Sequence, residues 1–354
     1  MPSWGTILGE LNQLQAKQDP RAFDTLRRKY LVALQNHTRR NTVLYAARWT
    51  HALPIPVPVS PEQVMITDED MEGFMEALTP LPASDGLDLI LHSPGGSAEA
   101  TEALVSYIRS KFADFRVLIP HAAMSAATML STSSNRISMG RQSSIGPIDP
   151  QFTVTGEGGV ARSSPAQAIL DQFSLAKKEC RDRNNLAAWV PMLTQYGPAL
   201  LVQCEESLKL SRELVKTWLA KYMLKGQRNA GMKASTIAKK LAKHTMFKTH
   251  ARHIDRDSAR AMGLVIEDME QDPKLEDLVL SVFHSMSLTF MGTPTMKLIE
   301  NHLGNAWVRA VQVNIVQAVR PPAGKPTMPL PPPGGVPTGE PSQTPSEIGP
   351  ISTP

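Results

Sequence analysis

Two short segments between residues 87 and 128 contain residue types that suit acyl transfer. Residues 87–96, LDLILHSPGG, form an apolar run that ends in a Gly-Gly turn. Residues 117–128, VLIPHAAMSAAT, form a second apolar run that ends in one serine, Ser125, among small residues. Backbone N–H groups in a tight turn can stabilise an oxyanion, and a serine at a strand-to-helix junction can attack a carbonyl carbon. The pattern therefore predicts Ser125 as a nucleophile.

The oxyanion hole is expected at the backbone N–H groups of Gly96 and Ala126. Glycine suits such a turn because it adopts positive φ and leaves no Cβ in the path of a substrate. Gly95 and the backbone from Ser97 onward are expected to contact an extended substrate as an added strand. The structural alternatives are that Ser125 only caps a helix and that the glycines only close a β-α turn.

These segments resemble the Clp protease/crotonase superfamily, and most closely the serine dehydrogenase proteinase family, whose relatives include signal peptide peptidase A. The resemblance depends on Leu91–Gly96, Ala123–Thr128 and Ile145–Gln151, with a weaker likeness over residues 248–265. It implies a stack of ββα units, a serine nucleophile, peptidase activity on a peptide or protein substrate, and self-assembly into homo-oligomers.

The resemblance leaves the general base open. In Clp-type peptidases a histidine follows the nucleophile at a position that falls near Asp149, yet no histidine lies between His121 and His244. Asp149, in a turn with two prolines, is expected to shape the substrate cleft. Relatives of signal peptide peptidase A use a lysine, and Lys177 and Lys178 lie in the corresponding region.

Two candidates for the base follow. Lys177 continues the apolar helical stripe of Ile169 and Phe173, which predicts a desolvated amine in a Ser-Lys dyad. The alternative is a lysine whose stem packs while its amine reaches water. His250 is the second candidate, since the resemblance places the third member of a Clp-type triad there. Its alternative is a structural histidine.

Apolar periodicity alternates between strands and helices, which predicts an α/β fold with a parallel sheet. The expected strands cover residues 42–48, 87–91, 116–119 and 136–139. The expected helices lie within residues 1–40, 67–78, 97–112, 124–133, 163–225 and 233–264. Residues 278–289 fit a strand or a helix equally well.

The expected domain organisation has three parts. An N-terminal helical segment covers residues 1–40. A Clp/crotonase-like peptidase domain covers residues 41–305, with a helical insertion at about 163–245. The proline-rich tail, residues 321–354, is expected to be disordered, as a solvated tether or a polyproline ligand for a partner.

Length, net charge, cysteine count and the absence of long apolar stretches exclude several classes of protein. The chain has 354 residues, a net charge of +4 and two cysteines, which excludes a disulfide framework and offers no metal-ligand spacing. No cofactor is expected, and without a P-loop the activity is expected to be independent of ATP. The absence of an apolar signal region or of an apolar stretch long enough to span a membrane favours a cytoplasmic protein. The lysines of residues 209–252 fit a solvated helix face better than a nucleic-acid site.

The leading hypothesis is a serine endopeptidase that forms an acyl-enzyme at Ser125. The missing histidine after the nucleophile motivates an alternative, a catalytically inactive oligomeric scaffold of the same fold. A third hypothesis is acyl-CoA chemistry, in which the same oxyanion hole holds a thioester enolate.

Overall fold

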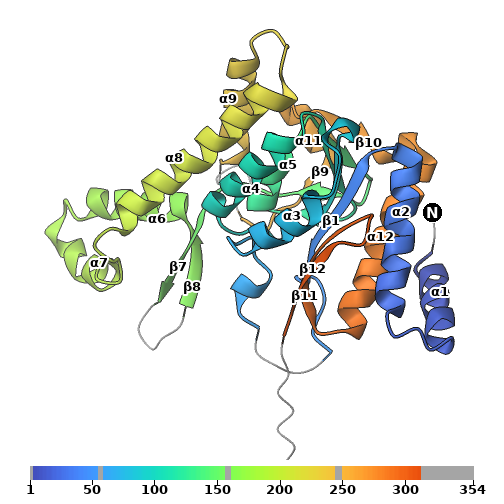
Figure 1. Ribbon diagram of the computed structural model, residues 1–354. Helices are drawn as coiled ribbons and strands as arrows, with labels where there is room; N and C mark the ends of the chain where they lie inside the picture. The colour runs from blue at the N-terminus through green and yellow to red at the C-terminus, as the bar shows by residue number, and fades with distance from the viewer. Residues whose placement is uncertain (1–2, 55–58, 156–160, 244–248, 312–354) are drawn as a thin grey trace, which may run out of the picture. The chain divides into compact units, whose positions relative to one another are not determined.

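A seven-stranded sheet forms the centre of the computed structural model (Figure 1). Five neighbouring strands are parallel, and two antiparallel strands complete one edge. The order is β10 (Ile266–Asp268), β5 (Arg136–Met139), β3 (Phe115–Ile119), β2 (Leu87–His92), β1 (Asn41–Ala47), β11 (Thr295–Asn301) and β12 (Ala306–Ala310). The four strands expected from the sequence are confirmed. They form here because short, almost wholly apolar runs suit strands that are covered on both faces.

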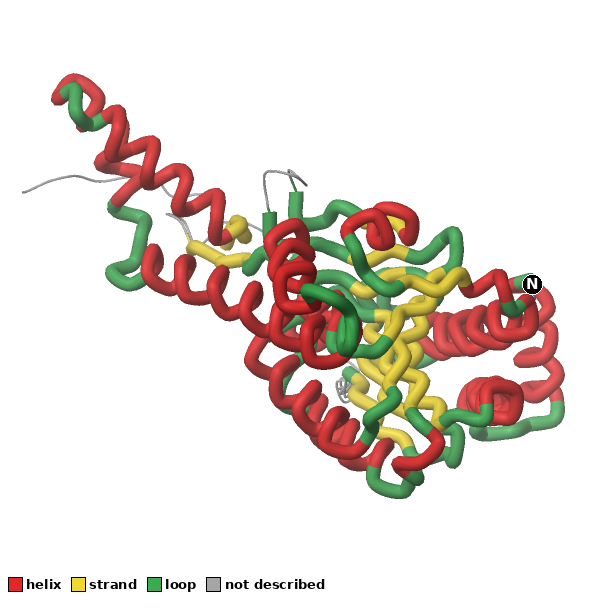
Figure 2. The backbone as a smooth tube through the Cα atoms, turned by 90° about the horizontal axis from the view of Figure 1, so that it is seen from above, coloured by secondary structure: helices red, strands yellow, loops and turns green. Residues whose placement is uncertain are grey.

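Helices cover both faces of this sheet, as Figure 2 shows. One layer contains α2 (Ala22–Thr38) and α12 (Pro273–Gly292), with α1 (Trp4–Ala16) against them. The other layer contains α3 (Asp70–Leu78), α4 (Ala98–Lys111) and α5 (Ala126–Thr132). The fold is therefore the mixed α/β architecture that the sequence predicted.

The alternation of side chains along β1 shows how the two layers are separated. Val43 and Tyr45 pack in the cluster with α3, α4 and α5, whereas Leu44 and Ala46 pack against α2 and α12. Successive side chains of a strand point to opposite faces of the sheet, so an apolar strand supplies both cores.

A small second sheet lies next to the carboxyl ends of β2 and β3. It contains β4 (Ala122–Ala123), β6 (Ser144–Ile145) and β9 (Ile254–Asp255). β4 and β6 are parallel, while β6 and β9 are antiparallel. This sheet brings residues near position 250 back to the segments that follow β3.

The segment from residue 151 to 262 adds a hairpin and several helices. The hairpin pairs β7 (Gln151–Thr155) with β8 (Ala161–Pro165) and is absent from the sequence prediction. The helical elements are α6 (Ala166–Glu179), α7 (Leu186–Leu193), α8 (Leu200–Trp218), the π-helical turn η5 (Leu219–Met223), α9 (Ala230–Leu241) and α11 (Arg256–Met262). The 3₁₀ turns are η1 (Pro61–Gln63), η2 (Ala83–Asp85), η4 (Arg183–Asn185) and η6 (Met269–Gln271).

The structure describes residues 3–54, 59–155, 161–243 and 249–311, all within one unit of the chain, residues 1–312. The proline-rich tail lies outside the described residues. Within them, no helix is both long and apolar enough to cross a membrane. The same ranges contain no cluster of three or more His, Cys, Asp or Glu side chains suited to a metal ion.

Candidate active site

Ser125 has a backbone conformation that serine rarely adopts. Its φ of 52° and ψ of −120° lie in a region favoured by glycine, at the junction between β4 and α5. Such a conformation costs about 1–3 kcal/mol and persists only where the surroundings enforce it. Its side chain forms no capping hydrogen bond with α5. The helix-cap alternative therefore does not explain this serine.

The Gly-Gly turn lies directly against the Ser125 segment. Gly95 has a φ of +97°, and a Cβ there would lie 2.6 Å from the Met124 carbonyl oxygen and 2.7 Å from Ser125 Cβ. The Ser93 N–H donates to the Ala122 carbonyl oxygen at 3.2 Å, and the Met124 N–H donates to the Ser93 carbonyl oxygen at 2.9 Å. Glycine at position 95 is therefore required twice, by its backbone angle and by the close approach.

Ile66 supports the other side of this turn. Its N–H donates to the Gly95 carbonyl oxygen at 2.8 Å, and its own carbonyl oxygen accepts the Ser97 N–H at 3.0 Å. A Cβ on Gly96 would lie 2.3 Å from both the nitrogen and the oxygen of Ile66. The backbone of Ile66 therefore packs against Gly96, a contact that the sequence did not predict.

The Gly96 N–H faces away from Ile66. N–H groups alternate in direction along an extended chain, so the group between the two Ile66 hydrogen bonds points to the opposite side. In the described ranges, neither this N–H nor that of Ala126 pairs with an acceptor. Ala126 opens α5, where the first N–H groups of a helix have no intrahelical partner. Both N–H groups can therefore donate to an oxyanion.

Ser97 differs from its expected role. Its N–H is bonded to Ile66, its carbonyl oxygen accepts from Thr101, and its side chain accepts the Ala100 N–H to cap α4. The Ser97 N–H is therefore unavailable to a substrate strand. Ser97 forms part of the cavity wall and anchors α4 instead.

His250 and Asp149 form a hydrogen-bonded pair. His250 Nδ1 lies 2.8 Å from Asp149 Oδ1, and the Asp149 side chain is fully buried while that of His250 is 25% exposed. A buried carboxylate beside Nδ1 favours the tautomer with hydrogen on Nδ1, which leaves Nε2 as an acceptor. Asp149 therefore orients the His250 ring, a contact that goes beyond the cleft-shaping expected from the sequence.

The small second sheet explains why these two residues meet. Ser144 pairs with Asp255 and Ile145 pairs with Ile254 in antiparallel register. Asp149 follows Ile145 by four residues and His250 precedes Ile254 by four, so this antiparallel pairing brings the two segments that carry them close together. The pairing depends on contact between distant segments, so local sequence patterns do not reveal it.

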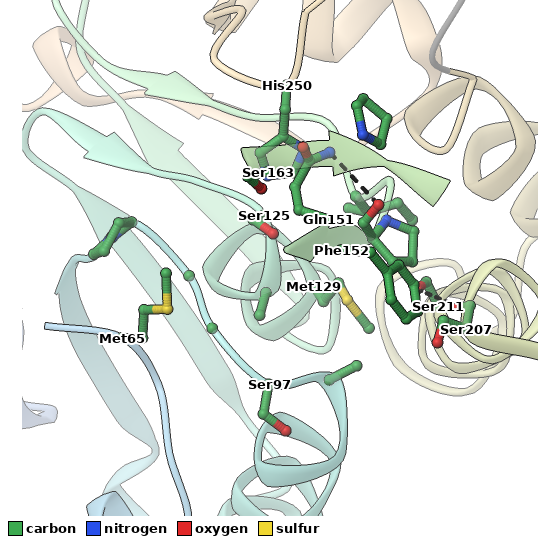
Figure 3. Close-up of a pocket in the computed structure, with 18 of the residues that line it drawn as sticks. Met65, Ser97, Ser125, Met129, Gln151, Phe152, Ser163, Ser207, Ser211 and His250 are labelled. Carbon is green, nitrogen blue, oxygen red and sulfur yellow. Dashed lines mark hydrogen bonds between the residues drawn. The ribbon is translucent and has the colours of Figure 1, made fainter. Parts of the chain in front are cut away.

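Ser125 and His250 line the same cavity, which has a volume of about 730 Å³ (Figure 3). Gly95, Gly96, Ser97 and Ala126 also line it. Its remaining walls include the β7–β8 hairpin, α8 and the loop between η1 and α3, through residues such as Phe152, Ser163, Leu210, Ser211 and Met65. The cavity is therefore large enough for several residues of an extended peptide.

Lys177 lies elsewhere, so the predicted Ser-Lys dyad is not formed. Ala176 is the buried residue in this turn of α6, whereas Lys177 and Lys178 are exposed, and neither lines the cavity. The Lys177 amine lies 5.8 Å from the centre of the Phe173 ring. The prediction of a desolvated amine was wrong, because the buried face of α6 includes Ile169 as expected but continues through Ala176 and not Lys177.

The arrangement brings together three kinds of group that acyl transfer uses. They are a serine in an enforced conformation, a histidine hydrogen-bonded to a buried carboxylate, and two backbone N–H groups, of Gly96 and Ala126, that have no acceptor among the described residues.

A match to one protein family points in the same direction. Residues 16–188 match a model of the family described as ClpP-like SDH-type serine proteinases. Two uncharacterized proteins of Methanocaldococcus jannaschii are similar, one 31% identical over 140 residues and the other 27% over 201 residues. These alignments cover 40% and 57% of this chain but only 46% and 59% of the relatives, about half of their length.

Solved structures of two mutants of the 1510-N membrane-bound stomatin-specific protease also match, one of them in complex with a substrate peptide. They are 17% and 18% identical, with TM-scores of 0.35 and 0.34. The matches cover 58% and 57% of this chain, and 77% and 71% of those chains.

Proposed function

We propose that this chain, whose residues 16–188 match the family of ClpP-like SDH-type serine proteinases, is a serine peptidase with a Ser125–His250–Asp149 triad. The observation that carries the proposal is the 2.8 Å hydrogen bond between His250 Nδ1 and buried Asp149, at a cavity that Ser125 also lines. A histidine held in this way is a general base for a serine hydroxyl.

In the proposed reaction, Ser125 Oγ attacks the carbonyl carbon of the scissile peptide bond while His250 Nε2 takes the hydroxyl proton. The carbonyl oxygen becomes an oxyanion that accepts hydrogen bonds from the N–H groups of Gly96 and Ala126. Collapse of this intermediate breaks the C–N bond, and His250 gives its proton to the leaving amine. Water then attacks the acyl-enzyme in the same way and releases Ser125.

The triad members follow the chain order serine, aspartate, histidine. The resemblance predicted a histidine near position 149 and a third member near 250. In the proposed triad these two roles are exchanged, with Asp149 as the orienting carboxylate and His250 as the base. Triads are defined by geometry rather than by chain order, so the exchange is compatible with the same chemistry.

We also propose that the substrate is an extended peptide or unfolded protein segment, cleaved without ATP. The 730 Å³ cavity and the free backbone groups at Gly96 support this substrate class. Assembly into a homo-oligomer is part of the same proposal. It is supported by α7, which has no buried residue and exposes Leu186, Val190 and Met192.

Labelling of the purified chain with a fluorophosphonate tests the proposal. We expect stoichiometric labelling of the wild type, none for Ser125→Ala, and a large loss of labelling rate for His250→Gln. Lys177→Ala is the matched control and should label at the wild-type rate, because Lys177 is exposed and outside the cavity. A folded wild type that does not label would contradict the peptidase and favour the scaffold. Loss of labelling in Lys177→Ala would restore the Ser-Lys dyad.

A further inference from the structure

A buried polar cluster lies behind the oxyanion-hole turn, on the α3 side of the central sheet. It contains Asp70 at the start of α3, Lys297 on β11 and Tyr45 on β1, and all three side chains are fully buried. Lys297 Nζ donates to Asp70 Oδ1 at 2.8 Å, and Tyr45 OH donates to Asp70 Oδ2 at 2.7 Å. A buried ion pair is costly to assemble, so its presence needs a reason beyond stability.

The cluster is linked to the backbone that supports Gly96. Asp70 Oδ2 also accepts the Thr67 N–H at 3.0 Å, and Lys297 Nζ donates to Thr67 Oγ1 at 3.3 Å. Thr67 follows Ile66, whose N–H and carbonyl oxygen are both bonded to the turn that contains Gly96. Asp70 is thus separated from the oxyanion-hole turn only by Thr67 and Ile66.

Tyr45 contributes a donor that keeps its proton. Burial, together with the neighbouring Asp70 carboxylate, raises the pKa of Tyr45 well above its ordinary value. Its hydroxyl therefore remains a hydrogen-bond donor to Asp70 throughout the pH range in which a histidine base works. An apolar pair in place of Asp70 and Lys297 would fill the space but would leave the Thr67 N–H without its acceptor.

We propose that Asp70, held by Lys297 and Tyr45, is a positioning residue that fixes Thr67 and Ile66 and thereby aims the Gly96 N–H at the oxyanion. This inference deepens the proposed function and rests on it. Asp70 touches no reacting atom, so its effect should appear in the chemical step and not in the binding of the reagent. Small displacements of an oxyanion donor reduce reaction rates strongly because the donor stabilises charge that exists only in the transition state.

The test compares Asp70→Asn with the wild type in the kinetics of fluorophosphonate labelling. The phosphonyl oxygen occupies the oxyanion hole as Ser125 adds, so the maximal labelling rate reports on the alignment of Gly96. We expect this rate to fall by about tenfold to a hundredfold, while the concentration for half-maximal rate changes by less than about twofold. Tyr45→Phe, which removes one donor and keeps the ion pair, should give a smaller fall of the same kind.

Glu300→Gln is the matched control for the loss of a buried ion pair. Glu300 also lies on β11 and is fully buried, but its partners are Arg27 and Arg28 of α2, on the opposite side of the sheet from Asp70. We expect lower thermal stability in this variant with an unchanged maximal labelling rate. If Asp70→Asn does not fold, the double variant Asp70→Asn/Lys297→Met, which leaves no unpaired buried charge, replaces it.

The outcomes separate the two proposals. An unlabelled wild type contradicts the proposed function itself. A labelled wild type with unchanged rates in both the Asp70 and Tyr45 variants overturns only the positioning role. An equal loss of rate in Glu300→Gln also overturns it, because general destabilisation would then explain the effect.

Discussion

Ser125 and Asp149 are both held in states that a folded chain adopts at a cost. Ser125 has a positive φ outside the left-handed helical region, and Asp149 places a carboxyl group in a fully buried position. His250 offsets part of the second cost through its hydrogen bond to Asp149. A strained backbone at Ser125 and a buried carboxyl group at Asp149 are typical of a functional site, since neither is needed for folding alone.

Asp149→Asn tests whether the carboxyl group orients the base. An asparagine side chain can present its amide group to Nδ1 of His250, which favours the tautomer with hydrogen on Nε2. That tautomer cannot accept a proton from Ser125. We expect the rate of fluorophosphonate labelling to fall by about 10³- to 10⁴-fold with the fold retained, measured together with the circular dichroism spectrum.

The control for this variant is Asp255→Asn. Asp255 lies on β9, a strand of the small second sheet, but its carboxylate accepts the Ser258 N–H as the cap of α11. Asparagine caps a helix about as well as aspartate, so this variant should keep both the free energy of unfolding and the labelling rate close to those of the wild type. An Asp149→Asn enzyme that keeps more than about a tenth of the wild-type rate would show that this carboxyl group is structural.

Gly95→Ala should abolish the labelling of Ser125 because it forces the backbone of the Gly-Gly turn to move. The new Cβ would lie within 3 Å of the Met124 carbonyl oxygen and Ser125 Cβ, at a φ that disfavours alanine. We expect labelling of Ser125 to become undetectable because the turn must move away from the nucleophile. Gly9→Ala is the control, since Gly9 lies in α1 with nothing within 4 Å of the added atom. That variant should label normally and gain about 0.5–1 kcal/mol of stability.

The sequence indicated Ser125, the Gly-Gly turn and, through the resemblance, His250 as candidates, but it did not predict which residues contact them. Ser125 and Gly96 stand out because each ends an apolar run, which is a local signal. The meeting of Asp149 with His250, and of Ile66 with Gly96, depends on pairing between segments far apart in the chain. Such pairings are determined by tertiary packing, which a single sequence does not display.

At the scale of elements, strong periodicity predicted the central strands and helices well. The predictions of secondary structure were less accurate for short segments and for segments whose pattern fits both a strand and a helix. Residues 278–289 belong to α12, whose length of 20 residues shows a helix buried along most of its course. The β7–β8 hairpin is rich in polar residues and lacks the apolar run that marked the central strands. The error on Lys177 arose because a shift of one residue on a helix turns a side chain by about 100°.

The helix α7 provides a prediction about assembly. Its eight residues, LAAWVPML, include no buried residue, and Val190 and Met192 are 51% and 41% exposed. An exposed apolar helix of this kind is typical of an interface with another copy of the chain. We expect Val190→Glu/Met192→Glu to reduce the molar mass measured by light scattering after size-exclusion chromatography.

The matched control for α7 changes exposed apolar residues on other elements. Met75 of α3 and Val202 of α8 are 51% and 63% exposed, and Met75→Glu/Val202→Glu introduces the same two charges. This variant should keep the wild-type molar mass. A mass that is unchanged by the α7 substitutions, or reduced equally by both pairs, would exclude α7 as the assembly surface.

At the scale of the whole molecule, the candidate site combines groups from distant parts of the chain. Ser125 and Asp149 lie within residues 16–188, whereas His250 and Lys297 lie beyond the region that matches the family. The region that matches the family therefore contains the proposed nucleophile, the Gly-Gly turn, Asp149 and Asp70. The proposed base His250 and Lys297, the ion-pair partner of Asp70, come from the remainder of the fold, so the proposed activity requires residues beyond the matched region.

The buried histidine His92 should make the stability of this unit sensitive to acid. His92 ends β2, is fully buried, and lies 5.5 Å from the ring of His121 and 5.3 Å from that of Phe283 on α12. Burial, aided by the neighbouring histidines, lowers the pKa of His92 to about 3. Between that value and the unfolded pKa of about 6.5, the unfolded chain binds one more proton at this position than the folded chain does.

The contribution of His92 to stability is therefore complete above pH 6.5 and is lost as the pH falls toward 3. Over this range it should lower the free energy of unfolding by up to about 1.4 kcal/mol per pH unit. We expect His92→Phe to reduce the slope of unfolding free energy against pH by nearly that amount between pH 6 and 4.5, measured by urea denaturation. Phe283→Leu, which disturbs the same packing without removing a titrating group, should lower stability but keep the wild-type slope. Equal slopes in the wild type and His92→Phe would mean that His92 is protonated in the fold, and that this part of the core is less sealed from water than its packing indicates.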